Sequence, residues 1–599
     1  MIPDSFDVAR LHAAYGAGLR PADVVREAIR RIRGTDEGVF LALVPEERAV
    51  AAAEALGAFD PTSQPLWGLP FAVKDNIDVA GLPTTAACPD FAYVSQANAA
   101  AVERLAAAGA ILIGKTNLDQ FATGLVGLRT PYPVPKNAFD PAIVPGGSSS
   151  GSALAVAHGL VSFALGTDTA GSGRVPAGLN NVVGLKPTLG AVSTRGVVPA
   201  CRTLDCVSVF AGTVDDAFAV YRAMAGFDAA DPFSRTVPVG TPGPLPPKLR
   251  LGIPDARSRR FFGDALAERA FDAGLADAEA LGLDIRPLDF APFFAVAELL
   301  YEGPWVAERY QAIRAFVETT PQALHPVTGR IIRGATRFSA ADAFAGLYRL
   351  AELRRATEPV WRDIDMLLVP TCPRPRRVAD LEADPVGPNS ELGTYTNFVN
   401  LLDLCALAVP GRFREDGFPS GLTLVAPAGR DAFLASLGAE LHAKAEEPLG
   451  ATGVPLPPMP ARTARARDGE IELAVVGAHL SGMPLNGELT RRGARFLRAV
   501  ATTPDYRLFA LAGGPPRRPG LMRVRDGAGH AIETEVWAVP IETFGSFVAG
   551  VPAPLGIGTA RLADGTAPKG FIVEAEAVNG AEDVSMFRSW RAYLGSLPG

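Results

Sequence analysis

Paired cysteines, long apolar runs and clusters of metal ligands are all missing from this sequence of 599 residues. The five cysteines are an odd, scattered set without a C-x-x-C pair, which favours reduced thiols over a disulfide framework or a zinc site. Since the His residues are scattered too, we expect no metal and no cofactor. No apolar run is long enough to span a bilayer, and the N-terminus lacks a basic segment before an apolar core. We therefore expect no membrane contact, no signal peptide and a cytoplasmic location.

Charge of one sign is not in large excess either. The 57 Lys and Arg residues are interleaved with 64 Asp and Glu residues, which gives a net charge of −7. Without a long basic run the protein is a poor partner for nucleic acid. An acidic balance does not attract anions, so an anionic substrate would need a specific Arg or Lys to hold it. We expect the partner to be a small-molecule substrate and the assembly to be a homodimer.

The sequence does contain short apolar runs that alternate with Ala-rich helical stretches. Runs such as LPFAVKDNI and VSFALGTDTAGS are bounded by Gly or Pro, which predicts buried strands that end in loops. Helical periodicity covers residues 7–57, residues 264–360 are mainly helical in pattern, and strands return at Asp365–Pro370 and Leu422–Ala426. This alternation predicts an α/β fold with a mixed β-sheet core flanked by helices.

A Pro-rich stretch near residue 450 predicts a boundary between two domains. We place a first domain at residues 1–445, a linker at 446–470 and a small C-terminal α/β domain at 471–599. The C-terminal segment begins with a predicted strand at Glu472–Val476, and its length is sufficient for independent folding.

Two loops rich in Gly and Ser carry the strongest chemical signal, VPGGSSSGS at 144–152 and GTDTAGSGRVPA at 166–177. Glycine permits unusual backbone angles and close approach to a ligand, while serine hydroxyls donate and accept hydrogen bonds. A flexible linker is the alternative, but both loops lie between apolar runs and the second follows a predicted strand. The loops are therefore expected to form a functional site.

Two generic patterns overlap or precede these loops. Gly147–Gly151 fits G-x-S-x-G, the nucleophile elbow of α/β-hydrolases, which requires a later His and Asp. Because candidate His residues exist, the pattern alone leaves this alternative open. Gly109–Thr116 fits the P-loop pattern, but its middle residues are themselves a predicted strand and not a phosphate-binding loop. We therefore reject a nucleotide site there.

Several segments, in the same order, resemble the amidase-signature family over roughly residues 20–440. They are GLPFAVKDNID around Lys74, PGGSSSGSA around Ser148, GTDTAGSGRVPA around Ser172, and GLKPT at 184–188. The resemblance implies that Ser172 is the nucleophile, that Ser148 follows a cis peptide and passes the proton, and that Lys74 accepts it. It also implies an oxyanion hole from the backbone N–H groups of Thr169, Ala170, Gly171 and Ser172. The implied supporting residues are Ser149, Asp168 and Arg174.

The residues around Lys74 agree with a role as base. A serine hydroxyl is a poor nucleophile until a base takes its proton. Keeping lysine neutral at pH 7 costs about 4.6 kcal/mol in water, and burial reduces this cost by lowering the pKa. Lys74 follows the apolar residues Phe71–Val73, which favours burial, and the side chain of Asp75 would point to the opposite face of a strand. A structural ion pair is the alternative interpretation of Lys74.

Segments at 75–89, 299–310 and 393–404 are similar to the allophanate hydrolase branch of this family. The resemblance implies that Tyr301 and Arg309 hold a substrate carboxylate and that Gly124 lets the backbone meet the urea end. An arginine fork suits this role because it binds a carboxylate through two parallel hydrogen bonds. The alternative is an amphipathic helix with Arg309 on the surface. The segment at 128–137 departs from the pattern of that branch, so the resemblance does not define the shape of one wall of the pocket.

Residues 471–599 resemble the appended domain of long allophanate hydrolases, which has a γ-glutamyl cyclotransferase-like fold. The matching segments are 475–486, 544–558 and 586–594. The resemblance implies that His479 helps to remove CO2 from N-carboxycarbamate, and a structural or dimerising role is the alternative. We therefore expect hydrolysis of allophanate to ammonia and carbon dioxide. The alternatives are an amidase of another small amide, such as the amidase component of a tRNA amidotransferase, and a non-catalytic scaffold.

Overall fold

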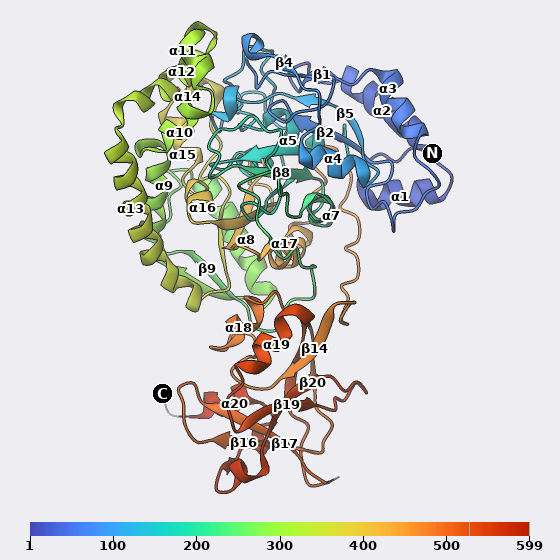
Figure 1. The fold of residues 1–599 in the computed structure, drawn as a ribbon, viewed down its shortest axis with the longest axis vertical. Coiled ribbons are helices and arrows are strands. Elements are labelled where there is room, and N and C mark those ends of the chain that lie inside the picture. Colours follow the sequence, from blue (N-terminus) through green and yellow to red (C-terminus); the bar gives the residue numbers. More distant parts are fainter. Residues whose placement is uncertain (526, 598–599) are drawn as a thin grey trace.

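An eleven-stranded mixed sheet runs through the larger of the two bodies into which the chain folds (Figure 1). The computed structural model describes residues 1–525 and 527–597, so residues 526 and 598–599 of the predicted C-terminal domain lie outside the described part. Across the sheet the strands are β1 (Phe40–Leu43), β5 (Ile111–Thr116), β2 (Pro70–Lys74), β6 (Phe163–Asp168), β8 (Cys206–Ala211), β7 (Val183–Lys186), β12 (Leu404–Pro410), β13 (Gly421–Pro427), β11 (Met366–Pro370), β9 (Arg250–Pro254) and β10 (Asp284–Leu288). The strands predicted at 365–370 and 422–426 are confirmed as β11 and β13.

Helices cover both faces of this sheet, as alternating residues of the central strands show. Leu407 and Leu424 belong to one apolar core, whereas their neighbours Ala406 and Val425 belong to a second core. The first core is covered by α1 (Val8–Gly16), α2 (Pro21–Arg33), α3 (Glu46–Glu54), α4 (Ala100–Ala107), α5 (Ser150–Ala157), α7 (Val214–Met224), α8 (Ala265–Ala280) and α17 (Asp431–Ala445). The second is covered by α9 (Ala291–Glu302), α10 (Trp305–Ala312), α13 (Ala340–Thr357) and α16 (Asn397–Leu401). Because both faces are buried, the central strands are continuous apolar runs in the sequence.

The parallel strands β2 and β6 are neighbours, so their carboxyl ends open at the same edge of the sheet. The chain after β6 passes through residues 169–174 into α6 (Val175–Leu179), and α5 begins directly after Ser149. Ligand sites of α/β sheets lie outside such carboxyl ends. Both loops singled out in the sequence therefore meet where a site is expected.

The two competing motif interpretations do not match the local structure. Lys115 and Thr116 lie in β5 itself, so the P-loop pattern does not form a phosphate-binding loop. The G-x-S-x-G pattern leads into α5, but it follows a loop and not the strand that a nucleophile elbow requires.

The smaller body is rich in strands. A five-stranded sheet has the order β15 (Arg495–Ala501), β18 (Glu533–Pro540), β14 (Glu470–Val475), β20 (Lys569–Val573) and β19 (Leu555–Thr559). A three-stranded sheet contains β17 (Arg518–Arg523), β16 (Tyr506–Leu511) and β21 (Glu582–Asp583). The helices of this part are α18 (Asn486–Thr490), α19 (Ile541–Ala549) and α20 (Trp590–Ser596). An apolar core of its own, with Trp537 and Trp590 fully buried, holds this body together.

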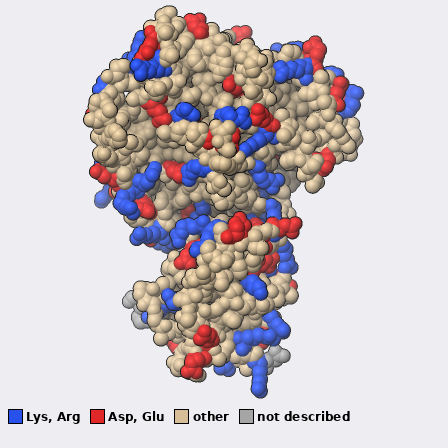
Figure 2. Space-filling view, in the orientation of Figure 1, with Lys and Arg blue, Asp and Glu red and all other residues tan. Residues whose placement is uncertain are grey.

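On the face drawn in Figure 2, both bodies carry charged side chains of both signs. On the face in Figure 2 acidic and basic side chains are interspersed, and Lys and Arg gather near the neck between the bodies. Within the described residues, no helix is long and apolar enough to cross a membrane.

Candidate active site

Lys74 is the last residue of β2, and its side chain is completely buried. Its Nζ lies 2.7 Å from Ser148 Oγ and 2.8 Å from Thr167 Oγ1. Asp75 instead pairs with Lys115 at 3.1 Å, so in the described part of the chain Lys74 has no carboxylate partner. Burial lowers the pKa of Lys74 to about 7. The amine is therefore poised to accept a proton near neutral pH.

Ser148 lies next to this amine and is completely buried. The Gly147–Ser148 peptide bond is cis, and the carbonyl of Ser148 accepts a hydrogen bond from the Asp119 N–H at 3.0 Å. The following hydroxyl, Ser149 Oγ, donates to the Thr167 carbonyl of β6 at 3.2 Å. These contacts connect the loop before α5 to the end of β6.

Ser172 lies in the loop between β6 and α6 and is 3% exposed. Its hydroxyl makes no hydrogen bond to any described residue, including Ser148. The preceding Gly171 has a φ of +129°, and a Cβ there would lie 2.3 Å from Thr396 Oγ1. Glycine is therefore required directly before Ser172.

The backbone N–H groups of this loop are not equivalent. Gly171 N–H donates to Asp168 Oδ1 at 2.9 Å. Within the described part of the chain, the N–H groups of Thr169, Ala170 and Ser172 have no acceptor. These three groups are thus available to a ligand, whereas that of Gly171 is already engaged.

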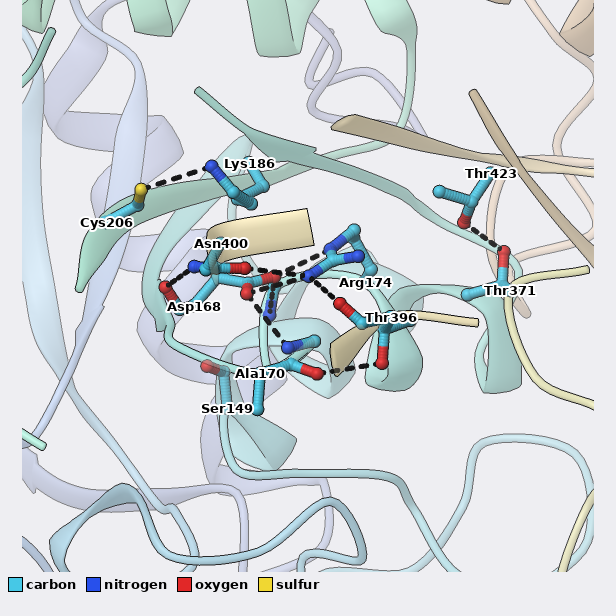
Figure 3. Close-up of polar contacts among 12 residues, drawn as sticks. Ser149, Asp168, Ala170, Arg174, Lys186, Cys206, Thr371, Thr396, Asn400 and Thr423 are labelled. Carbon is cyan, nitrogen blue, oxygen red and sulfur yellow. Dashed lines mark hydrogen bonds and ion pairs between the residues drawn. The ribbon is translucent and has the colours of Figure 1, made fainter. Parts of the chain in front are cut away.

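A buried polar network supports the loop that carries Ser172 (Figure 3). Arg174 Nε and Nη2 donate to the two carboxylate oxygens of Asp168 at 2.9 and 3.0 Å. Burial acts to raise the pKa of Asp168, but the charge and hydrogen bonds of Arg174, together with the charge of Lys186 and the Gly173 N–H, outweigh it and hold the pKa below its usual value. Asn400 Nδ2 donates to the Asp168 carbonyl at 2.9 Å, and Thr396 Oγ1 donates to the Ala170 carbonyl at 2.8 Å. Helix α16 thereby fixes the path of the loop.

Tyr301 and Arg309 come from successive helices. Tyr301 lies in the last turn of α9, Pro304 caps α10, and Arg309 lies within α10. The guanidinium carbon of Arg309 is 5.4 Å from the centroid of the Tyr301 ring. Arg309 is only 2% exposed, so the alternative of a surface arginine is wrong.

The Arg309 guanidinium is only partly satisfied. Its Nη1 donates to the Ala122 carbonyl at 3.3 Å and to Thr123 Oγ1 at 3.4 Å. Its Nε and Nη2 are buried and have no partner among the described residues. Buried charged donors without acceptors are costly, and an anionic ligand would remove that cost. Gly124 is the next residue after Thr123. A Cβ at this position would lie 2.6 Å from Asp119 Oδ2, so a larger residue would clash with Asp119.

Several residues of the site do not stand out in the sequence alone. Thr167 contacts Lys74, Asp119 holds the loop that follows Gly124, and Asn400 and Thr396 brace the loop that carries Ser172. Asn400 and Thr396 lie in the segment 393–404, whose resemblance to the allophanate hydrolase branch assigns no role to either residue. In the sequence, only that resemblance points to Asn400 and Thr396, because a single Asn or Thr does not by itself indicate a functional site.

His479 lies in the smaller body, just after β14, and lines a cavity of about 190 Å³ together with Glu488. Its Nε2 is 3.2 Å from Glu488 Oε2, and its ring stacks on Phe571 at 5.1 Å between centroids. Burial lowers the pKa of His479, and Glu488 acts in the opposite direction. Across the described residues, no group of three or more His, Cys, Asp or Glu could hold a metal ion.

Comparison with known proteins accounts for both bodies. The Amidase family model matches residues 23–434, and the model of the Allophanate hydrolase C-terminal domain matches residues 471–595. The chain therefore belongs to the amidase family of hydrolases. Its second body is an allophanate hydrolase C-terminal domain.

Relatives of known structure and sequence cover nearly the whole chain. A solved structure of Kluyveromyces lactis allophanate hydrolase is 40% identical, covers 98% of this chain and 99% of that chain, and has a TM-score of 0.76. Urea amidolyase of Saccharomyces cerevisiae is 44% identical over 89% of this chain, which spans only 30% of that protein. A glutamyl-tRNA(Gln) amidotransferase component of Thermus thermophilus is 35% identical over 72% of this chain and 96% of that protein.

Proposed function

We propose that this chain is an allophanate hydrolase that releases ammonia through Ser172, Ser148 and Lys74. The observation that carries the proposal is the environment of Lys74, a buried amine without a carboxylate partner, 2.7 Å from the hydroxyl of Ser148. Such an amine is neutral often enough at pH 7 to act as a general base. The match to the allophanate hydrolase of Kluyveromyces lactis over nearly the whole chain supports the substrate.

The reaction follows from the order of the three side chains. Ser172 Oγ attacks the terminal carbonyl of allophanate while its proton passes to Ser148, whose own proton passes to Lys74. The tetrahedral intermediate collapses as the C–N bond breaks, and ammonia leaves with the proton returned by the same route. Water then cleaves the ester on Ser172 and yields N-carboxycarbamate. The proton relay requires Ser172 and Ser148 to form a hydrogen bond when substrate is bound.

The oxyanion hole in this proposal differs in one donor from the sequence-based expectation. We assign it to the N–H groups of Thr169, Ala170 and Ser172, which are free to donate. Gly171 contributes by its backbone conformation, because its own N–H already binds Asp168. Donors fixed before the reaction stabilise developing negative charge without reorganisation.

Selection of a carboxylated urea is assigned to Tyr301 and Arg309. The unpaired Nε and Nη2 of Arg309 supply the two donors that a carboxylate fork needs. The Tyr301 hydroxyl supplies a further directional donor. An amidase of simple aliphatic amides would have no use for a buried, partly unsatisfied guanidinium, which favours allophanate over that alternative.

The nucleophile is tested by Ser172→Ala, measured as ammonia release from allophanate. We expect a loss of at least about 10³-fold, as for removal of a serine nucleophile in other enzymes. Ser150→Ala is the matched control, because Ser150 is also buried and its hydroxyl has no partner in the described part of the chain. Ammonia release at the native rate by Ser172→Ala would contradict the role of Ser172 as nucleophile.

For the C-terminal body we propose that His479 promotes loss of CO2 from N-carboxycarbamate. The support is its position in a small cavity next to Glu488, where burial lowers the pKa of the imidazole. A neutral imidazole can take up or deliver the proton that decarboxylation requires.

Carbon NMR of the products tests this role in full-length protein. His479→Ala should release the first ammonia at the native rate and accumulate N-carboxycarbamate. His530→Ala is the control, since His530 lies in the same body but is exposed. Identical product ratios for His479→Ala and the native protein would leave His479 with a structural role.

A further inference from the structure

Asp205 is a buried carboxylate beside the nucleophile loop. It precedes β8 and is 6% exposed. Its Oδ1 accepts hydrogen bonds from Thr169 Oγ1 at 2.5 Å and from the Cys201 N–H at 3.2 Å. Its Oδ2 accepts from the Ala200 N–H at 2.8 Å. Asp205 makes no ion pair within the described part of the chain, so these hydrogen bonds are its direct polar contacts.

The contact of Asp205 with Thr169 means that each of the three consecutive residues 168–170 is held by a hydrogen bond from outside the loop. Helix α16 holds the carbonyl of Asp168 through Asn400 and the carbonyl of Ala170 through Thr396. Thr169, between them, is held through its side chain by Asp205. The peptide units on either side of Thr169 are therefore held both through their neighbouring carbonyls and through the Thr169 side chain.

We propose that Asp205 is a positioning residue that orients the Thr169 and Ala170 N–H groups toward the oxyanion formed at Ser172. This inference rests on the proposed function, because it presupposes that these N–H groups stabilise a tetrahedral intermediate. Asp205 does not touch the substrate in this proposal. It acts through Thr169, and its loss lets the peptide units rotate away from the reacting carbonyl.

The ionised form of Asp205 is the one that can hold the loop. A carboxylate offers acceptors to all the donors that surround it, whereas a protonated carboxyl would turn one oxygen into a donor that faces another N–H or O–H. Asp205 also lines a cavity of about 570 Å³, which gives protons access to it. Burial raises the pKa of Asp205 to about 6. Protonation of Asp205 should therefore weaken its hold on Thr169 as the pH falls through about 6.

The charges around Asp205 come from several elements. Lys74 of β2 and Arg309 of α10 are the cations whose fields reach it, and Cys201 and Cys206 are the titratable groups nearest in the chain. The other charged residues that line the same cavity are Arg195, Arg202, Asp231 and Glu308. Removal of the Asp205 charge should lower the pKa of Lys74, because Asp205 favours its protonated form.

Steady-state kinetics on allophanate test the proposal. Asp205→Asn should lower kcat at least about tenfold with KM changed less than about threefold, since only the transition state is affected. Thr169→Val removes the same contact from the other side and should cause a similar loss. Thr169→Ser, which keeps the hydroxyl, should recover most of that loss. The double variant Asp205→Asn, Thr169→Val should be no worse than the single ones, because the two act through one contact.

Asp231→Asn is the matched control. Asp231 is also 6% exposed and lines the same cavity, but its carboxylate holds Ser193 and Thr194 instead of the nucleophile loop. Its kcat should stay within about twofold of the native value. An equal loss in both Asp variants would overturn the proposal, because it would indicate general destabilisation of the cavity wall.

The pH profile gives a second, independent readout. With Lys74 titrating near 7 and Asp205 near 6, log kcat/KM of the native protein should fall with a slope of about 1 below pH 7 and about 2 below pH 6. The profile of Asp205→Asn should keep a slope of about 1 at all acidic pH values. Its acidic limb should also move to lower pH, because loss of the Asp205 charge lowers the pKa of Lys74. An unchanged double slope in Asp205→Asn would refute the assignment.

Failure of this inference can be told apart from failure of the proposed function. A small fluorophosphonate labels an activated serine as the P–F bond breaks and the Ser172 Oγ–P bond forms, with fluoride leaving, whatever the natural substrate is. If the native protein labels at Ser172 but does not hydrolyse allophanate, the substrate assignment fails alone. If Asp205→Asn and Thr169→Val label as fast as the native protein, the positioning role of Asp205 fails.

Discussion

Two buried basic side chains of the larger body, Lys74 and Arg309, have different surroundings. Lys74 meets only hydroxyl groups, so burial dominates and its pKa falls to about 7. Arg309 remains charged at any physiological pH and keeps two donors unpaired. One residue is therefore suited to move protons and the other to bind an anion, although both are basic residues in the sequence.

Arg309→Lys should raise the KM for allophanate about 10- to 100-fold, because a lysine cannot form the two parallel hydrogen bonds of a guanidinium. Rates on malonamate should fall in parallel, whereas rates on uncharged aliphatic amides should hardly change. Arg314→Lys is the control, since Arg314 forms an exposed ion pair with Glu318. Equal KM values for the native protein and Arg309→Lys would contradict a carboxylate clamp and favour an amidase of another substrate.

At the scale of elements, the short helix α16 acts as a brace for the loop between β6 and α6. Asn400 on this helix donates to the carbonyls of Asp168 and Leu204, both at 2.9 Å. Its Oδ1 also accepts from Arg174 Nη2 at 3.3 Å. A helix of only five residues has little stability of its own, so its position depends on these contacts and on packing.

Asn400→Ala should lower the free energy of unfolding by about 2 kcal/mol or more, since it leaves two buried carbonyls without a donor. Urea denaturation measures this change, and kcat should fall with it because the loop loses a support. Asn397→Ala in the same helix is the control, because the Asn397 side chain makes no hydrogen bond to the described residues. If both variants lost equal stability, packing of α16 and not the Asn400 contacts would be the cause.

At the scale of the whole molecule, two bodies with separate cores are joined by a segment that packs on the larger one. Leu449 is 4% exposed, Arg10 Nη2 donates to the Pro455 carbonyl at 2.8 Å, and Arg462 pairs with Asp215 at 2.6 Å. Direct contacts between the bodies include hydrogen bonds of Arg430 Nη1 to Thr490 Oγ1 at 3.3 Å and of the Lys248 N–H to Ser481 Oγ at 3.2 Å. The first part of the predicted linker thus packs as part of the larger body.

A truncated protein that ends at residue 460 should still release the first ammonia at close to the native rate, since Lys74, Ser148 and Ser172 all lie in the larger body. A protein that ends at residue 445 should be less stable, because it loses Leu449 from the core and the contact of Pro455 with Arg10. Thermal melting and ammonia release measure the two effects. Loss of ammonia release in the longer form would show that the bodies are not separable.

The regular elements were largely predictable from local patterns. The apolar runs before Lys74 and Asp168 are strands, and residues 264–360 are mainly helical, because periodicity and burial are local properties of a sequence. The helical prediction for residues 7–57 missed β1, which pairs with β5 about seventy residues later. A four-residue strand has too short a pattern to be recognised without its partner.

The sequence by itself determined which reactive side chains this protein has, because the Gly- and Ser-rich loops, Lys74 and Arg309 can be recognised from residue type and order alone. Only the tertiary structure decided how that chemistry is arranged. It placed Asp75 against Lys115 and away from Lys74, engaged the Gly171 N–H with Asp168, and set Asp205 under Thr169. These contacts depend on distances between elements that are far apart in the chain. A hydrogen bond of about 3 Å between such elements cannot be inferred from the number of residues that separate them.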